Sequence, residues 1–255
     1  MTDSKPGFIW YELMTTDQDA AEAFYRAVVG WKMADAGQPG MRYTILSAEG
    51  RPMGGLMKLP APGMPPAWLG YVGVPDTDAA AKQIAEAGGA IHHPPDNIPN
   101  VGRFAVVADP GGAVFQLLTP LPRADAPPPA DPKTLGLVSW HELYSSIGER
   151  AAFEFYSKQF GWETLDLMDM GEMGKYRIFG AGGVPMGGMM DKPPQAPASA
   201  WGFYVNVDGI DAAIERIKQN GGQVTMGPHQ VPGDQWIVQA LDPQGAAFAL
   251  VSDQR

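Results

Sequence analysis

Two glutamates at matching places in the two parts of the chain are the residues best suited to chemistry. Glu12 lies in the segment Trp10-Tyr11-Glu12-Leu13, and Glu142 lies in the similar segment Trp140-His141-Glu142-Leu143. A carboxylate on an apolar surface needs a polar partner or a raised pKa. It could then act as a general base, accept a hydrogen bond from a ligand or bind a cation. The alternative is a structural glutamate that backbone N–H groups or a nearby arginine or lysine satisfies.

The two segments belong to a longer repeat that runs through most of the chain. Matching residues keep a nearly constant offset, so only a few inserted residues separate the two copies. This self-similarity indicates a tandem duplication. The other matching pairs are Phe24-Tyr25 with Phe155-Tyr156, Gly30-Trp31 with Gly161-Trp162, Pro52-Met53-Gly54-Gly55 with Pro185-Met186-Gly187-Gly188, Trp68 with Trp201, Tyr71 with Tyr204, Gly88-Gly89 with Gly221-Gly222, and Asp109-Pro110 with Asp242-Pro243.

A strand must position each glutamate, because the residues around it alternate in polarity. In the first copy, the alternating stretch 8–14 precedes Thr16-Asp17-Gln18-Asp19, which supplies N-cap chemistry and an acidic first turn for a helix over 20–29. Three short strands follow, and the pattern then restarts near Trp68, with Asp76 before a second helix. The chain is therefore predicted to contain four βαβββ modules, two in each copy. The apolar face of the first helix consists of Ala21, Phe24, Tyr25 and Val28.

A proline-rich segment separates the two copies. Residues 120–136 contain six prolines and show no apolar periodicity, as in an extended, semi-rigid linker. We expect a first domain over 1–119 and a second domain over 137–255, each long enough to bury its own core. Two βαβββ modules side by side should curl into a cup-shaped, eight-stranded mixed sheet with its helices outside. The predicted fold class is therefore α+β, with a small-molecule site in each cup.

Charge and composition exclude several classes of partner. The formal net charge of −10 disfavours nucleic acid and anionic membranes. No apolar run approaches the ~18–20 residues of a membrane-spanning helix, and the N-terminus lacks the features of a secretory signal. We therefore expect a cytoplasmic protein, either a monomer or a homodimer. The absence of cysteine excludes disulfides, thiolate metal ligands and thiol nucleophiles.

Repeated aromatic and methionine side chains favour a planar or apolar ligand, because methionine adapts to the shape of what it contacts. Core packing is the alternative for any one of them. The glycines Gly54-Gly55 and Gly187-Gly188 would leave open space on the floor of each sheet or permit a bulge. The candidate ligand-binding residues are Trp10, Tyr43, Met53, Trp68, Tyr71, Gln116, Trp140, Tyr176, Met186, Trp201 and Tyr204, and the candidate catalytic residues are Glu12 and Glu142.

The order of these motifs resembles the vicinal oxygen chelate superfamily, which includes glyoxalase I, extradiol dioxygenases and bleomycin-resistance proteins. The resemblance covers nearly the whole chain apart from the linker. It implies cup-shaped sheets with a ligand site inside, but binding proteins and enzymes share this fold. The motifs that carry it are Asp17, Phe24-Tyr25, Gly30-Trp31, Pro52-Met53-Gly54-Gly55 and the closing run from Asp109-Pro110-Gly111-Gly112 to Phe115, and the motifs recur in the second copy.

Enzymes that resemble this chain hold a divalent metal with His and Glu from the first and last strands of each module. Carried over to this sequence, those positions match poorly. They fall at Trp10, at Gln116 and Ala249, near Gly55 and Gly188, and near Trp68–Gly70 and Trp201–Phe203. These side chains are not ligands for Zn, Ni, Mn or Fe. We therefore expect no complete metal site and no bound cofactor.

The histidines leave one ambiguity about metal binding. The second copy contains one inserted residue. If that residue lies outside the turn that follows the strand of His141, then His141 falls on the ligand position. If the insertion lies in that turn, His141 points away from Trp140 and Glu142 and packs against the helix layer. His92-His93 and His229 are expected in loops, where adjacent histidines on an extended chain point apart.

Three functions remain open from the sequence. The first is a metal-independent protein that binds a small aromatic or apolar molecule in each cup. The second is a glyoxalase-like lyase or a dioxygenase that uses Glu12, Glu142, His141 and Gln116 in a non-standard site, with a divalent metal such as Zn, Ni, Mn or Fe. The third is a scaffold whose cups are filled by its own side chains.

Overall fold

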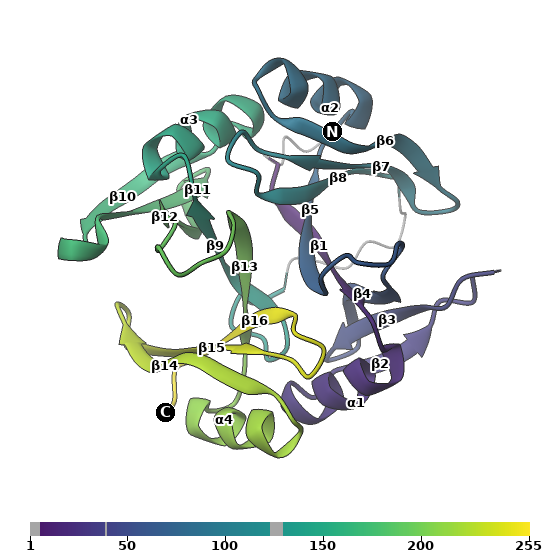
Figure 1. The fold of residues 1–255 in the computed structure, drawn as a ribbon, viewed down its shortest axis with the longest axis vertical. Helices are drawn as coiled ribbons and strands as arrows, with labels where there is room; N and C mark the ends of the chain where they lie inside the picture. The colour runs from purple at the N-terminus through teal and green to yellow at the C-terminus, as the bar shows by residue number, and fades with distance from the viewer. Residues whose placement is uncertain (1–5, 39, 123–129) are drawn as a thin grey trace. The chain divides into compact units, whose positions relative to one another are not determined.

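The computed structural model describes residues 6–38, 40–122 and 130–255. These residues form two eight-stranded mixed sheets and four α-helices (Figure 1), which confirms the predicted α+β class with four βαβββ modules. Part of the predicted linker, residues 123–129, lies outside the described residues.

The first sheet contains the first two modules in the order β2-β3-β4-β1-β5-β8-β7-β6. Within the first module, β1 pairs with β4 in parallel, and β3 pairs antiparallel with both β2 and β4. The elements are β1 (Phe8–Thr15), α1 (Gln18–Val28), β2 (Lys32–Asp35), β3 (Tyr43–Ala48), β4 (Arg51–Lys58), β5 (Ala67–Gly73), α2 (Thr77–Glu86), β6 (Ala90–Ile98), β7 (Gly102–Ala108) and β8 (Val114–Pro120).

The second sheet repeats this order as β10-β11-β12-β9-β13-β16-β15-β14. The agreement between the two orders confirms the tandem repeat at the level of topology. The elements are β9 (Val138–Ser145), α3 (Glu149–Phe160), β10 (Glu163–Asp169), the short 3₁₀ turn η1 (Gly171–Met173), β11 (Lys175–Ala181), β12 (Val184–Asp191), β13 (Ala200–Asn206), α4 (Ile210–Gln219), β14 (Gln223–Val231), β15 (Gln235–Leu241) and β16 (Ala247–Ser252).

Aspartates begin the two helices of the first half, as predicted. The Asp17 carboxylate accepts a hydrogen bond from the backbone nitrogen of Ala20 at 3.1 Å, and Asp76 accepts one from Ala79 at 3.0 Å. Each bond satisfies one of the N–H groups that the first turn of a helix leaves without a partner.

The third helix begins differently. Its N-cap residue, Gly148, has no side chain, and the Asp191 carboxylate at the end of β12 instead accepts a hydrogen bond from the Glu149 nitrogen at 2.8 Å. The helix ends at Gly161, which adopts the left-handed conformation with φ of 69° that favours glycine.

The α1 helix packs against its sheet through the face that the sequence predicts. Ala21, Phe24, Tyr25 and Val28 are all buried. The strands contribute Leu13, Leu46 and Leu56, which are fully buried. This apolar layer between the helix and the sheet is the hydrophobic core of the first module.

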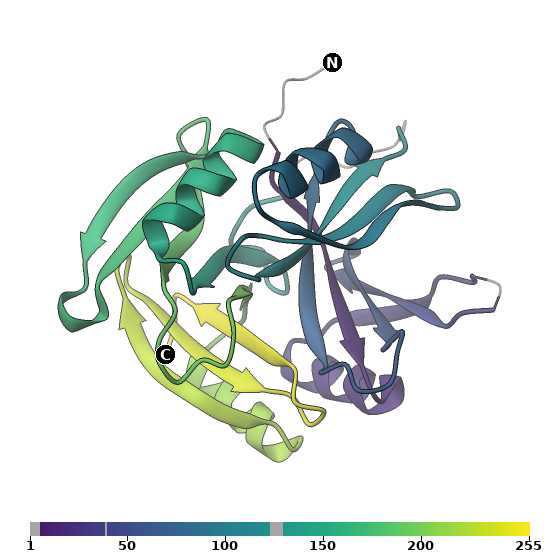
Figure 2. The same cartoon turned by 45° about the horizontal axis from the view of Figure 1, so that its top comes forward.

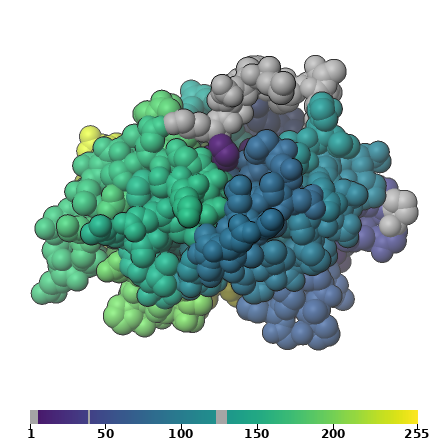
Figure 3. Space-filling view, turned by 90° about the horizontal axis from the view of Figure 1, so that it is seen from above, coloured from purple at the N-terminus to yellow at the C-terminus, as the bar shows by residue number. Residues whose placement is uncertain are grey.

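The described residues separate into two compact units, and each unit takes one module from each half of the chain. Unit 1 comprises the described residues among 1–9, 70–128 and 140–201, and unit 2 comprises those among 10–69, 129–139 and 202–255. In unit 1, α2 and α3 lie side by side, and in unit 2 α1 and α4 do so (Figures 1 and 2). The neighbouring surfaces of α2, in blue, and α3, in green, are visible in Figure 3. The expected boundaries at 1–119 and 137–255 remain a prediction.

Candidate functional site

Each sheet has one face that carries its helices, and side-chain contacts identify the opposite face. Thr44 on β3 donates a hydrogen bond to Glu22 on α1 at 2.6 Å, so the neighbouring Tyr43 points away from that helix. On β11, Arg177 forms an ion pair with Glu149 of α3 at 2.6 Å, so Tyr176 also points away from its helix. We call the face turned away from the helices the inner face.

Three side chains of the first sheet, all of them in unit 2, form a hydrogen-bonded triad on the inner face of that sheet. The indole nitrogen of Trp10 donates to the Tyr43 hydroxyl at 3.0 Å. That hydroxyl donates to Oε2 of Glu12, also at 3.0 Å. Trp10 and Tyr43 are half-buried, whereas Glu12 is only 4% exposed. The phenol therefore connects an indole donor to a buried carboxylate.

Unit 1 contains the same triad on its inner face. The indole nitrogen of Trp140 donates to the Tyr176 hydroxyl at 2.8 Å, and that hydroxyl donates to Oε1 of Glu142 at 3.0 Å. All three side chains are half-buried. The structure therefore brings together, in each copy, two predicted ligand-binding residues and the predicted catalytic glutamate.

Glycines make room for both tyrosine rings. A Cβ atom on Gly55 would overlap the hydroxyl end of Tyr43, and one on Gly188 would overlap the ring of Tyr176. The tyrosine rings therefore occupy the open space expected at Gly55 and Gly188. The pairing register shifts beside the neighbouring glycines Gly54 and Gly187, as the alternative of a bulge predicts. Gly55 and Gly188 are needed for the triads to form, since any other residue would displace the phenol.

The surroundings keep both phenols protonated. Burial raises the pKa of Tyr43 well above its usual range, and the negative charge of Glu12 raises it further. Burial, followed by the charge of Glu142, raises the pKa of Tyr176 in the same direction. Each tyrosine therefore acts as a hydrogen-bond donor to its glutamate at neutral pH, not as a phenolate.

A second kind of cluster in unit 2 lies on the side of the strands that carries the helices. We call it the helix-side cluster. The Tyr25 hydroxyl donates to Oδ2 of Asp242 at 3.1 Å and accepts a hydrogen bond from the Trp68 indole at 2.8 Å. Trp31 stacks on the Tyr25 ring, with centroids 5.5 Å apart. Tyr25 belongs to the first half of the chain and Asp242 to the second half, so this cluster joins the two halves inside one unit.

Unit 1 contains the reciprocal cluster. Tyr156 of the second half donates to Oδ2 of Asp109 of the first half at 3.1 Å, and it accepts a hydrogen bond from Trp201 at 2.9 Å. Trp162 stacks on Tyr156 at 5.5 Å. Burial raises the pKa of Asp109, as it does that of Asp242, while hydrogen bonds from backbone N–H groups and from the tyrosines oppose this shift.

The predicted ligand residues Trp68 and Trp201 therefore lie in the helix-side clusters and not with the inner-face triads. Their indole N–H groups already have partners in the core. The matching Phe-Tyr, Gly-Trp and Asp-Pro motifs of the repeat supply the other members of the same clusters. These motifs have a structural function in joining the two halves.

Comparison with known proteins supports a single family. The family model described as Glyoxalase/Bleomycin resistance protein/Dioxygenase superfamily matches residues 7–117 and 150–250. The chain belongs to this superfamily.

Relatives within the superfamily align along nearly the whole chain. A putative glyoxylase, CFP32 of Mycobacterium tuberculosis, is 32% identical over 95% of this chain and 93% of its own length. The anthracycline biosynthesis protein DnrV of Streptomyces peucetius is 29% identical over 98% of this chain and 95% of its own length. Both alignments therefore extend over the two copies of the repeat in this chain.

A solved structure shows the same fold. The Mn(II)-bound glyoxalase of Novosphingobium aromaticivorans superposes with a TM-score of 0.65 at 16% identity, covering 98% of this chain and 82% of that one. Among the helices of the described residues, none is both long enough and apolar enough to cross a membrane.

The metal positions implied by the superfamily do not fit a divalent cation in this chain. The described residues include no group of three or more His, Asp or Glu side chains that could hold a metal. At two of the implied positions, Gly55 and Gly188, the space for a ligand side chain is taken by a protonated phenol. Indole, glycine and a neutral phenol are poor donors for such cations.

His141 points away from the Trp140 triad, as the alternative with the insertion in the turn predicts. It is buried at 7% exposure, and its ring stacks on Phe8 at 4.5 Å. Its Nδ1 donates a hydrogen bond to the backbone oxygen of Met186 at 2.6 Å. Burial lowers the pKa of His141 to about 4, so the ring is neutral at pH 7.

The other predicted ligand residues lie in several places. Gln116 and Tyr71 are buried on neighbouring strands and face each other in register, with exposures of 1% and 4%. Tyr204 accepts a hydrogen bond from Gln239 at 2.7 Å. Met53 is buried beside the helix-side cluster of unit 2. None of these contacts tests ligand binding, which remains a prediction for these residues.

A narrow cavity of about 10 Å³ lies beside the helix-side cluster of unit 2, with Tyr11, Trp31 and Val138 among its lining residues. In the repeat, Val138 matches Phe8, whose ring packs on Trp201 at 5.1 Å in unit 1. The smaller valine therefore leaves room for about one water molecule where unit 1 has an aromatic ring.

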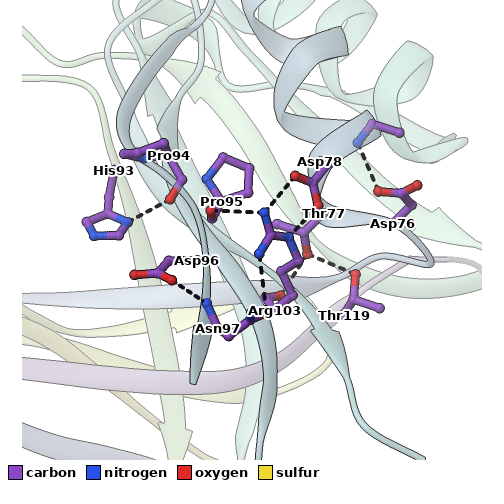
Figure 4. A network of polar contacts seen from close by, with 11 residues as sticks. Asp76, Thr77, Asp78, His93, Pro94, Pro95, Asp96, Asn97, Arg103 and Thr119 are labelled. Atoms are coloured by element: carbon purple, nitrogen blue, oxygen red, sulfur yellow. Dashed lines mark hydrogen bonds and ion pairs between the residues drawn. The ribbon is translucent and has the colours of Figure 1, made fainter. Parts of the chain in front are cut away.

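The remaining histidines lie in strands, so the prediction of loops for them is wrong. His92 and His93 belong to β6, and His229 belongs to β14. His93 stacks on Phe104 at 5.0 Å, and its Nδ1 lies 2.8 Å from the carbonyl oxygen of the next residue (Figure 4). It is therefore engaged in local packing at the edge of the sheet.

An ion pair lies next to this edge strand, at the start of β7. Arg103 binds the Asp78 carboxylate and also donates to Asn97 at 3.2 Å, as Figure 4 shows. The groups lie at the surface, where such pairs contribute little to stability. Because the charges and polar groups satisfy one another, this network does not form a ligand site.

Proposed function

We propose that this protein binds a small planar aromatic molecule on the inner faces of its sheets, without the metal site that the superfamily implies. The observation that carries the proposal is the triad of Trp, Tyr and Glu, which occurs twice with nearly the same distances. An indole and a phenol offer flat apolar surfaces, and the carboxylate offers a hydrogen-bond acceptor.

The relatives favour the aromatic class of ligand. DnrV and DauV, 29% identical along 98% of the chain, are both named as anthracycline biosynthesis proteins. Anthracyclines are planar polycyclic molecules, which are suited to stacking on indole and phenol rings. The strongly acidic composition further favours a neutral or cationic ligand over an anion.

A titration of the intrinsic tryptophan fluorescence tests the proposal. The probe is naphthalene, and the control is decalin, which has a similar size but no aromatic ring. We expect naphthalene to quench the fluorescence saturably and to raise the melting temperature. We expect weaker binding of decalin, because stacking adds about 0.5–1.5 kcal/mol to the burial of surface. Absence of saturable naphthalene binding, or equal binding of decalin, would refute the proposal.

Variants locate the binding. Trp140→Phe should weaken naphthalene binding by about fivefold, because it removes aromatic area and the hydrogen bond to Tyr176. The matched control is Trp236→Phe, since Trp236 packs under the Arg255 guanidinium and not in a triad. Equal weakening by both variants would mean that the ligand does not bind at the triad.

The second candidate is a metal-dependent lyase or dioxygenase. The name of the CFP32 relative, putative glyoxylase, is the observation that favours it. Elemental analysis of protein purified without a histidine tag distinguishes the candidates. Stoichiometric Zn, Ni, Mn or Fe, with binding or turnover that a chelator abolishes, would favour the enzyme over the metal-independent binding protein.

A further inference from the structure

The two triads differ in the side chains beside the tyrosine. On the inner face of unit 1, Tyr176 lies directly opposite Met168 of β10 on one side and Met190 of β12 on the other. Residues directly opposite each other in antiparallel strands share a face, so the three form a row. Both methionines are half-buried. Two flexible thioethers therefore flank the phenol on this side of the sheet.

In unit 2, a methionine lies on only one side of the tyrosine. Tyr43 lies opposite Met57 of β4, but on the other side β2 ends at Asp35. The next residue, Ala36, donates its backbone N–H to the backbone oxygen of Tyr43 at 2.9 Å, so an alanine lies where unit 1 has Met168. In unit 1, β10 continues past this position to Asp169.

The glutamates also differ. Glu12 is 4% exposed, whereas Glu142 is half-buried. A hydrogen bond from a ligand to Glu142 therefore requires less rearrangement than one to Glu12. The site in unit 1 therefore combines the more exposed carboxylate with two flexible methionine side chains.

From these differences we infer that the triad of Trp140, Glu142 and Tyr176 is the principal ligand site, and that its ligand is an aromatic ring bearing a phenolic hydroxyl group. This inference rests on the proposed function and specifies it. The hydroxyl donates to the Glu142 carboxylate, while Met168 and Met190 contact the ring. An aromatic carboxylate is excluded, because its charge would face the charge of Glu142.

Three probes of the same ring system separate these contributions: naphthalene, the phenol β-naphthol, and the anion β-naphthoate. Binding is measured by tryptophan fluorescence and isothermal calorimetry on the full chain. For the wild type we expect β-naphthol to bind about tenfold more tightly than naphthalene, because a hydrogen bond to a charged acceptor adds to the ring contact. We expect no measurable binding of β-naphthoate.

Variants in unit 1 test each contact. Glu142→Gln should reduce the affinity for β-naphthol by about tenfold and leave naphthalene nearly unchanged. Met168→Ala should weaken both probes by about fivefold, because it removes apolar contact without touching the carboxylate. The matched controls, Glu172→Gln and Met173→Ala, change exposed residues of the η1 turn and should leave both affinities as in the wild type.

Different results overturn different claims. If the wild type binds neither naphthalene nor β-naphthol, the proposed function fails and the inference fails with it. If both probes bind but Met168→Ala and Glu142→Gln act no more strongly than their controls, only the inference fails. The inference also fails if Glu12→Gln and Met57→Ala, with melting temperatures like that of the wild type, reduce binding more than the variants of unit 1.

Discussion

The buried histidine of unit 1 should make the stability of this protein depend on pH in a way that one substitution removes. His141 is 7% exposed and stacks on Phe8, and its Nδ1 donates to the backbone oxygen of Met186. Burial lowers its pKa from the ordinary 6.5 to about 4. Because the unfolded chain binds this proton more strongly than the folded chain does, the free energy of unfolding must fall as the pH falls from about 6.5 to about 4.

The size of this effect follows from the two pKa values. One pKa unit corresponds to about 1.4 kcal/mol, and the difference between 6.5 and about 4 gives a loss of about 3 kcal/mol by pH 4. The contribution of His141 to the free energy of unfolding is fully present well above pH 6.5, where the ring is neutral in both the folded and the unfolded chain. His141→Gln keeps a donor for the Met186 oxygen but cannot take up a proton in this range.

Urea unfolding followed by tryptophan fluorescence, at several pH values between 7 and 4, measures the effect. We expect the free energy of unfolding of the wild type, minus that of His141→Gln, to decrease by about 3 kcal/mol across the range. Other titrating groups, including the buried aspartates, cancel in this difference. His92→Gln changes an exposed histidine and should keep the pH dependence of the wild type. A parallel course for the wild type and His141→Gln would refute the burial argument.

Three further changes test other contacts. Val138→Ile adds one methylene group beside the cavity of unit 2, so we expect calorimetry to show a stability gain of about 0.5–1 kcal/mol; a loss would mean that the cavity cannot admit the added group. Tyr25→Phe and Asp242→Asn form a double-mutant cycle, for which urea unfolding should give a coupling of about 1.5–3 kcal/mol. A coupling near zero would contradict the bond between the halves. Gly188→Ala should displace the Tyr176 ring and reduce the unfolding free energy by about 1–3 kcal/mol, and an unchanged urea midpoint would count against that contact.

Local patterns in the sequence were enough to predict the parts of the fold that depend on near neighbours. The spacing of Ala21, Phe24, Tyr25 and Val28 identified the buried face of α1, because a helix brings residues three and four apart onto one side. The polar run Thr16-Asp17-Gln18-Asp19 predicted where this helix begins to within two residues, and the structure shows that Asp17 is its N-cap. The comparison of the two copies then supplied the order of the modules and the α+β class.

Contacts between distant parts of the chain could not be predicted in the same way. The repeat identified Gly55 and Tyr43 as important, but only the structure shows that the ring lies over the glycine. Pairing register decides this, and nothing near either residue specifies it. Likewise, the repeat marks Trp68 as a candidate ligand residue, but nothing near it in the sequence shows that its indole donates a hydrogen bond to Tyr25 of α1.

The bond between Tyr25 and Asp242 also sets an order of events during protein synthesis. The two residues are 217 positions apart, and a ribosome that adds about 5–20 residues per second needs on the order of 10–40 s to make that length. Unit 1 has all of its residues once Trp201 has been added, while unit 2 still lacks residues 202–255. Until those residues emerge, Trp31 and Trp68 already lie against Tyr25, but Phe24 lacks its contact with Phe248 and the Tyr25 hydroxyl lacks its acceptor on Asp242. The helix-side cluster of unit 2 can therefore be completed only at the end of synthesis.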